Sequence, residues 1–136
     1  MRPVPLVVAV VCALALPPVL AWLGLSRALG AHPFWDFKTA LIGAPVGVVA
    51  GLAASSLARW PRIALAIAVL AAATVLAVYG KTRFAASYAE DALAGQLWYF
   101  GWVGVAAGLS LTVMAVMTFA QAGRVTQKGT YDAERD

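Results

Sequence analysis

The residues best suited to proton transfer are one histidine and three acids, all outside the long apolar segments of the chain. His32 precedes Asp36 by four residues, and Glu90 is followed directly by Asp91. An imidazole beside a carboxylate serves as an acid and base near neutral pH. The spacing alone does not bring His32 to Asp36 or Glu90, so an enzyme at the membrane surface is a secondary alternative. We therefore assign no catalytic residue.

The same residues do not predict a metal ion or a cofactor. One histidine cannot supply the paired axial ligands of a membrane cytochrome, and the single cysteine, Cys12, lies in an apolar run. No second cluster of histidines or cysteines completes a zinc site. The stripes of aromatic and basic residues that single-strand binders use are also absent. We expect no metal, no cofactor and no nucleic-acid partner.

The composition is that of an integral membrane protein. Of the 136 residues, 62% are hydrophobic and only 12% are charged, and the mean hydropathy is +0.83. Soluble domains have about 25% charged residues. We expect an all-α protein with one membrane domain at residues 1–122. A polar cytoplasmic tail at residues 123–136 is expected to be flexible.

Four apolar segments are long enough to span a hydrocarbon core of roughly 30 Å. They cover residues 4–25, 39–58, 63–79 and 97–120. Residues 1–15 also fit a cleaved signal peptide, but the apolar run continues for ten residues beyond the small-residue site, so a first transmembrane helix is favoured. The short connection at residues 59–62 predicts an antiparallel hairpin. The expected fold is an antiparallel bundle of four transmembrane helices.

Small residues recur every four positions in two of these segments, a small-xxx-small pattern. At 3.6 residues per turn, this spacing forms one stripe on a helix, where a neighbouring backbone can approach closely. The second segment, with Val48 off its stripe, is the expected packing spine, and the alanines of the third segment are expected to lie against it. The stripe residues are Gly43, Gly47, Gly51 and Ser55 in the second segment, Gly104, Gly108 and Thr112 in the fourth, and Ala64, Ala68 and Ala72 in the third.

The longest connection, residues 80–96, is expected to contain a short interfacial helix at residues 87–93. Ser87 and Glu90 have the three-residue spacing of a capping box, in which each side chain accepts a hydrogen bond from the backbone of the other. This spacing predicts that the helix begins at Ser87.

The distribution of basic residues predicts which side each connection faces. Six lie on the side of the termini (Arg2, Arg59, Arg62, Arg124, Lys128, Arg135) and four in the other two connections (Arg27, Lys38, Lys81, Arg83). The positive-inside rule then places both termini in the cytoplasm, with the protein in the plasma (inner) membrane. The opposite side gathers most of the aromatic rings. Its candidate contacts for a partner or ligand are His32, Trp35, Asp36, Glu90, Asp91 and Trp98; an aromatic belt is the alternative interpretation.

The four predicted spans contain no Asp, Glu, Lys, Arg or His. Proton-coupled carriers and pumps generally hold a proton on an ionisable group inside the membrane, so this class is disfavoured. We expect a non-catalytic membrane protein that acts as a subunit, an assembly factor or a homo-oligomer, and that binds other helices through its small-residue stripes and its aromatic outer rim. Its partners would be the lipid bilayer and other transmembrane helices. A channel or facilitator for a small solute, formed by oligomerisation, is the main alternative.

The predicted topology can be tested with two reporters. A reporter fused after Asp136 should behave as cytoplasmic, and one inserted near Ala86 should behave as external, because an odd number of predicted spans separates them. Enzymatic reporters of known compartment would measure this. If both reporters were on one side, the four-span model would be wrong.

Overall fold

The described part of the chain is helical and contains no strand. The computed structural model describes residues 3–133, and the side chains of residues 5–118. Four of its helices are long and apolar enough to cross a membrane, as the sequence predicts. The elements are α1 (Pro3–Trp22), α2 (Leu25–Ala28), α3 (Asp36–Ala53), the 3-10 helix η1 (Ala54–Ser56), α4 (Arg59–Ala86) and α5 (Ala92–Ala133).

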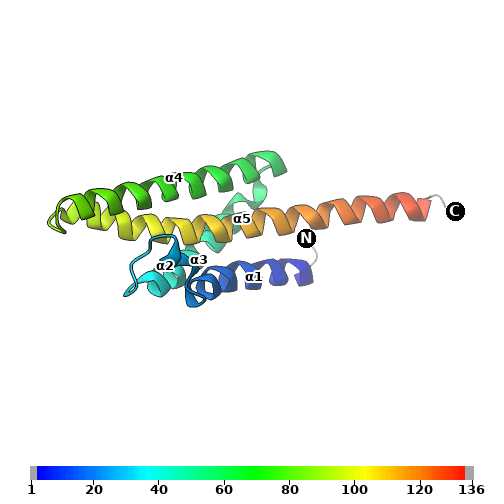
Figure 1. The fold of residues 1–136 in the computed structure, drawn as a ribbon. Helices are drawn as coiled ribbons and strands as arrows, with labels where there is room; N and C mark the ends of the chain where they lie inside the picture. Colours follow the sequence, from blue (N-terminus) through cyan, green and yellow to red (C-terminus); the bar gives the residue numbers. More distant parts are fainter. Residues whose placement is uncertain (1–2, 134–136) are drawn as a thin grey trace.

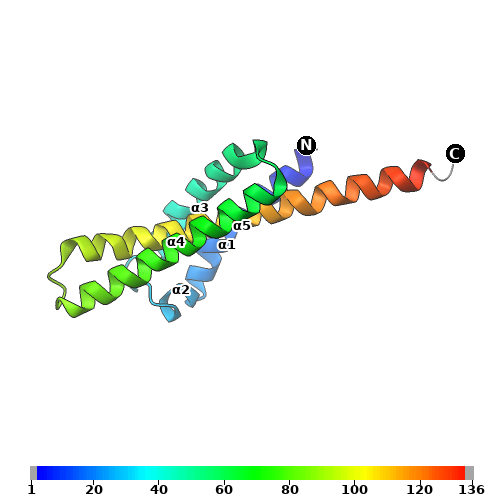
Figure 2. The same cartoon turned by 90° about the horizontal axis from the view of Figure 1, so that it is seen from above.

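Helix α5 is the centre of the arrangement. It packs against α1, α3 and α4, and α1 also packs against α3. The two termini and the α3–α4 connection lie towards one end of the molecule, and α2 and the α4–α5 connection towards the other, which we call the loop end (Figure 1). With 42 residues, α5 is roughly 60 Å long, twice the thickness of a hydrocarbon core. It extends well past the other helices (Figure 2).

The first helix ends three residues before the predicted boundary at Leu25. Gly24 has a φ of 82°, the left-handed conformation that commonly ends a helix, and its N–H donates to the carbonyl of Ala21. The chain then turns into the short helix α2. Hydropathy does not distinguish a glycine that ends a helix from one inside it, and the end of the helix was therefore predicted too late.

Helix α3 begins and ends earlier than predicted. Its first residue is Asp36 rather than Thr39, and the α-helix stops at Ala53 rather than at Ala58. A carboxylate in the first turn is favourable because it faces the positive end of the helix dipole. Ser55 falls in η1 and is exposed, so the predicted continuation of the glycine stripe to Ser55 is wrong.

The predicted interfacial helix at residues 87–93 is not present, because α4 and α5 both extend into that connection. Helix α4 continues to Ala86 instead of ending at Tyr79, and α5 begins at Ala92 instead of Leu97. Their contact explains the extra turns, since a methyl group added at Gly80 would overlap the backbone of α5 at Trp98. These extra turns contain polar residues, and for this reason hydropathy predicted a loop there.

The predicted capping box is also wrong. The carboxylate of Asp91 accepts a hydrogen bond of 2.9 Å from the N–H of Ala94, so Asp91 caps α5. The Ser87 hydroxyl accepts a hydrogen bond of 2.9 Å from the N–H of Asp91 instead of from Glu90. At the other end of α5, residues 123–133 are a helical continuation where we expected a flexible tail, and residues 134–136 lie outside the described residues.

The glycines of α3 face α5. A methyl group added at Gly43 would overlap the carbonyl oxygen of Val103, and one added at Gly47 would overlap the carbonyl oxygen of Ala107. At Gly51 the added carbon would lie 2.9 Å from the Cβ atom of Met114. All three glycines are buried. The backbone of α5 therefore approaches α3 as closely as the absence of a side chain allows.

The opposite face of α5 approaches α4 in the same way. Methyl groups added at Gly101, Gly104 and Gly108 would lie within 3 Å of atoms of Ala77, Ala73 and Leu70. The expected contact of α4 with the stripe of α3 is therefore wrong, and α4 packs on α5 instead. A short connection holds two helices together only at their joined ends, which leaves α4 free to pack elsewhere. The alanines expected at the contact, Ala64, Ala68 and Ala72, are exposed.

One residue predicted to lie off the stripe is part of the core. Val48 is buried against a cluster with Ala9, Ala13 and Met114, because α1 covers the flank of the glycine stripe. The neighbouring Val49 is 66% exposed and faces away from the protein. A control substitution for the glycine stripe therefore belongs at Val49.

We predict that Gly47→Ala destabilises the fold and that Val49→Ile does not, although each change adds one carbon. The added carbon at Gly47 meets a carbonyl oxygen of α5 and forces the helices apart, at a cost of about 1–3 kcal/mol. Thermal unfolding of the detergent-solubilised protein measures the difference. Equal midpoints for the two variants would contradict a close contact at Gly47.

Candidate functional site

Five aromatic rings meet at the loop end, and we call His32, Phe34, Trp35, Trp98 and Tyr99 the rim cluster. The imidazole of His32 stacks on Phe34 and Trp35, with ring centroids 5.4 and 5.7 Å apart. Trp35 meets Trp98 and Tyr99 edge to face at 5.2 and 5.3 Å. Aromatic pairs in these geometries are worth about 0.5–1.5 kcal/mol each beyond their buried area. The cluster thus joins residues 32–35 to α5.

Trp98 connects the rim cluster to the rest of the loop end. Its indole N–H donates a hydrogen bond of 3.1 Å to the carbonyl oxygen of Gly30. Its ring also lies edge to face with His32 at 5.6 Å and contacts Phe84 of α4 at 5.9 Å. Gly30 has a φ of 110°, which other residues rarely adopt. The backbone turn at Gly30 therefore presents its carbonyl to the indole.

Beneath the rim cluster, a partly buried ion pair joins α2 to the first turn of α3. The carboxylate of Asp36 is 2% exposed and accepts a hydrogen bond from the Nε atom of Arg27, whose side chain is 52% exposed. The Ser26 hydroxyl donates to the same carboxylate oxygen at 3.4 Å. Burial of a carboxylate is costly unless it is paired. Arg27 and Ser26 meet that requirement, and in doing so they fix α2 against α3.

The residues between α2 and α3 form a compact turn. The carbonyl of His32 accepts a hydrogen bond of 3.0 Å from the N–H of Asp36, and the Nδ1 atom of His32 accepts one of 3.3 Å from the N–H of Phe34. The Thr39 hydroxyl donates to the carbonyl of Asp36 at 2.8 Å. These local bonds restrain the backbone that carries the rings of residues 32–35.

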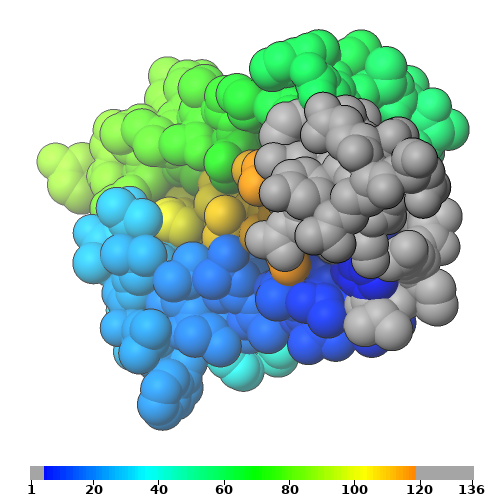
Figure 3. All heavy atoms as spheres, turned by 90° about the vertical axis from the view of Figure 1, so that its right-hand side faces the viewer, coloured from blue at the N-terminus to red at the C-terminus, as the bar shows by residue number. Residues whose placement is uncertain are grey.

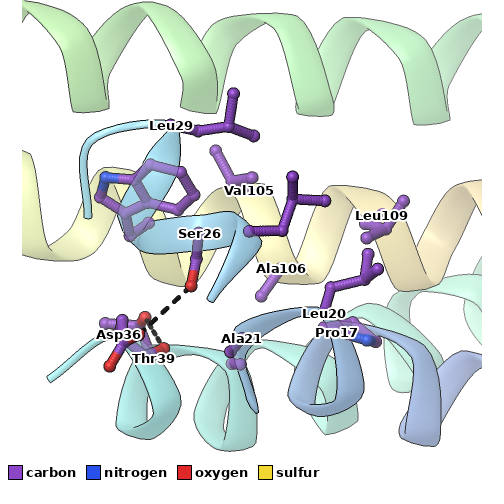
Figure 4. Close-up of a pocket in the computed structure, with 13 residues that line it drawn as sticks. Pro17, Leu20, Ala21, Ser26, Leu29, Asp36, Thr39, Val105, Ala106 and Leu109 are labelled. Atoms are coloured by element: carbon purple, nitrogen blue, oxygen red, sulfur yellow. Dashed lines mark hydrogen bonds between the residues drawn. The ribbon is translucent and has the colours of Figure 1, made fainter. Parts of the chain in front are cut away.

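A cavity of about 90 Å³ lies next to the ion pair, between α1, α2, α3 and α5. Figure 4 shows Asp36, Ser26 and Thr39 at one end of it, with Leu20, Leu29 and Leu109 among the apolar side chains around the rest. Because the polar groups at its end already bond to one another, the cavity presents an almost entirely apolar wall.

The structure brings together only part of the predicted set of site residues. His32, Trp35 and Trp98 meet in the rim cluster, and Asp36 lies below it in the ion pair. Glu90 and Asp91 lie in the α4–α5 connection, and no hydrogen bond or ion pair joins them to the rim cluster within residues 5–118. Two residues of the site were not predicted from the sequence: Arg27, which pairs with Asp36, and Gly30, which accepts the hydrogen bond from Trp98.

The polar side chains of the site bond mainly to one another or to the backbone. The carboxylate of Asp36 accepts from Arg27, and the Nδ1 atom of His32 accepts from a backbone N–H, and among residues 5–118 no hydrogen bond joins the imidazole to a carboxylate. Within the same residues, no three His, Cys, Asp or Glu side chains are grouped to hold a metal ion. Of the rim cluster, Phe34 is exposed and the other four rings are half-buried.

The described chain defines an all-helical protein with four helices long and apolar enough to span a membrane. No protein-family model, curated protein or solved structure matches it. Its function must therefore be inferred from its own residues and their geometry.

We predict that Asp36→Asn destabilises the protein, while Glu90→Gln has no effect. The amide keeps the volume of the carboxylate but loses its charge-assisted bond to Arg27, at a cost of about 1.5–3 kcal/mol. Glu90 is exposed, so its charge contributes little. Thermal unfolding in detergent measures both effects.

A double-mutant cycle with Arg27→Gln separates the ion pair from other effects. If the two residues of the ion pair are coupled, the loss of unfolding free energy in the double variant should be smaller than the sum of the losses in the two single variants. Additive losses would contradict coupling between Arg27 and Asp36.

Proposed function

We propose that this protein is a non-catalytic membrane protein that binds a protein partner through the rim cluster, as a subunit, an assembly factor or a homo-oligomer. The observation that carries the proposal is Phe34, which is 86% exposed and is stacked on a histidine held by two tryptophans. Exposed aromatic side chains on a rigid support are typical anchors of protein interfaces. The partner would place an apolar pocket or a ring against Phe34.

In this proposal the glycine stripes do not bind the partner, in contrast to the rim cluster. Gly43, Gly47, Gly104 and Gly108 face neighbouring helices of the same chain, which supports an internal packing role for these small-xxx-small patterns. They are then not available to a partner helix. A homo-oligomer would therefore use the rim cluster and adjoining surfaces. The bundle is antiparallel in this proposal, with α5 as its axis.

The proposed orientation follows from the basic residues. With both termini in the cytoplasm and the protein in the plasma membrane, the rim cluster lies on the external side. The partner would then approach from that side or from within the outer leaflet. Among the described residues, no specific observation favours the two alternatives, a channel for a small solute and an enzyme that transfers protons.

We predict that Phe34→Ala weakens partner binding by about tenfold, which is the effect of losing about 1.4 kcal/mol. Because Phe34 is 86% exposed and its ring stacks on His32 at the edge of the rim cluster, its removal should leave the amount of protein in the membrane unchanged. Quantitative co-purification from native membranes, normalised to protein level, measures the effect.

Trp60→Ala is the matched control, since Trp60 is an exposed ring at the opposite end of the molecule, where it contacts Arg59. It should leave co-purification unchanged. If Phe34→Ala instead lowered the membrane level, or if the two variants behaved alike, the aromatic rings would be membrane anchors and the binding proposal would be wrong.

A further inference from the structure

A recess, which we call the cleft, lies between α4 on one side and α1 and α2 on the other; α4 lines the larger of its two cavities, and α1 and α2 line the smaller. Two cavities of about 90 and 200 Å³ lie along it, and both are lined by Leu29, Trp102 and Val105. Figure 3 shows the recess, with atoms of α5 (yellow to orange) visible between α4 (green) and α1 and α2 (blue). Helices α1 and α4 each pack against α5, and α5 forms the floor of the cleft.

The larger cavity is suited to a hydrocarbon chain. One face of α4 lines it with Thr74, Ala77, Val78 and Lys81, and Leu29 and Gly30 lie opposite. The Thr74 hydroxyl donates to the carbonyl of Leu70 at 2.8 Å, so it offers no free donor. A volume of 200 Å³ exceeds the roughly 150 Å³ that binds benzene in an engineered apolar cavity. An acyl chain in this cavity would make dispersion contacts with the apolar side chains that line it.

The charge at the mouth of this cavity distinguishes it from the smaller one. Lys81 follows the apolar run of α4, and its ammonium group lies directly against Gly30. Within residues 5–118, Lys81 forms no ion pair and no hydrogen bond, whereas Arg27 is neutralised by Asp36. An anionic group in the cleft would therefore bind at Lys81.

We propose that this cleft binds one anionic phospholipid, with an acyl chain in the cavity beside α4 and the lipid phosphate on the ammonium group of Lys81. The order of these features along α4 matches that of a lipid, because the apolar residues Ala77 and Val78 of the cavity precede Lys81. A phosphate bonded to a lysine at the membrane surface is a common form of lipid recognition. The site is separate from the rim cluster, and it requires no protein partner.

The test is native mass spectrometry of the delipidated protein in detergent, titrated with phosphatidylglycerol or with a diacylglycerol of the same chains. The wild type should retain one phosphatidylglycerol in preference to diacylglycerol. Lys81→Ala should weaken phosphatidylglycerol binding about fivefold, the equivalent of about 1 kcal/mol for one basic residue. Lys81→Arg should restore binding to within about twofold. Lys38→Ala is the charge control, since Lys38 is exposed and lines neither cavity.

A second pair of variants tests the acyl chain. Val78→Trp fills the larger cavity and should reduce the binding of both lipids, while Val75→Trp, at an exposed position of α4 outside the cavity, should not. Thermal unfolding confirms that all variants are folded. Equal retention of the two lipids, no effect of Lys81→Ala, or no difference between the two tryptophan variants would overturn the proposal. Competition by inorganic phosphate at concentrations similar to those of the lipid would also overturn the proposal. In that case the acyl chain would contribute nothing to the binding free energy.

Discussion

The close approach of α5 to the helices on its two sides is the contact on which the rest of the structure depends. Lipid tails are as apolar as leucine, so helices inside a membrane associate through close packing rather than through exclusion of water. Here Gly43 and Gly47 bring α3 to the backbone of α5, and Gly101 and Gly104 bring α5 to α4. These contacts fix the register of α5, which in turn sets the position of Trp98 at the loop end.

The rim cluster and the ion pair below it are two parts of one arrangement. Arg27 and Asp36 hold α2 on the first turn of α3, and Trp98 holds the turn between them through the carbonyl of Gly30. Residues 32–35 are thus restrained from both ends and from α5. A surface restrained in this way loses little conformational entropy on binding, which favours recognition by exposed rings.

Hydropathy was sufficient to find the four long helices, but not their ends. Lys81 and Arg83 suggest a loop, although they lie in α4, because the contact of Gly80 with α5 extends both helices. The spacing of the glycines predicts that another helix packs closely, but not which helix. For this reason α4 was predicted to pack on α3, whereas it packs on α5. Arg27 and Asp36 are nine residues apart across a turn, and no pattern predicts their meeting. The rings of His32, Trp35 and Trp98 were identified from their sequence positions, but their stacking depends on the path of the backbone.

The central position of α5 also bears on how the protein is made. Synthesis proceeds from the N-terminus, so in the proposed membrane topology α1, α3 and α4 would enter the membrane before the helix on which all three pack. At about 5–20 residues per second, residues 92–118 need on the order of seconds to emerge. During this interval α1 and α3 can pair with each other, whereas α4 has no partner against which it packs. The glycine face of α3 is then open to the helices of other proteins, and insertion of the last helix completes assembly in a single step.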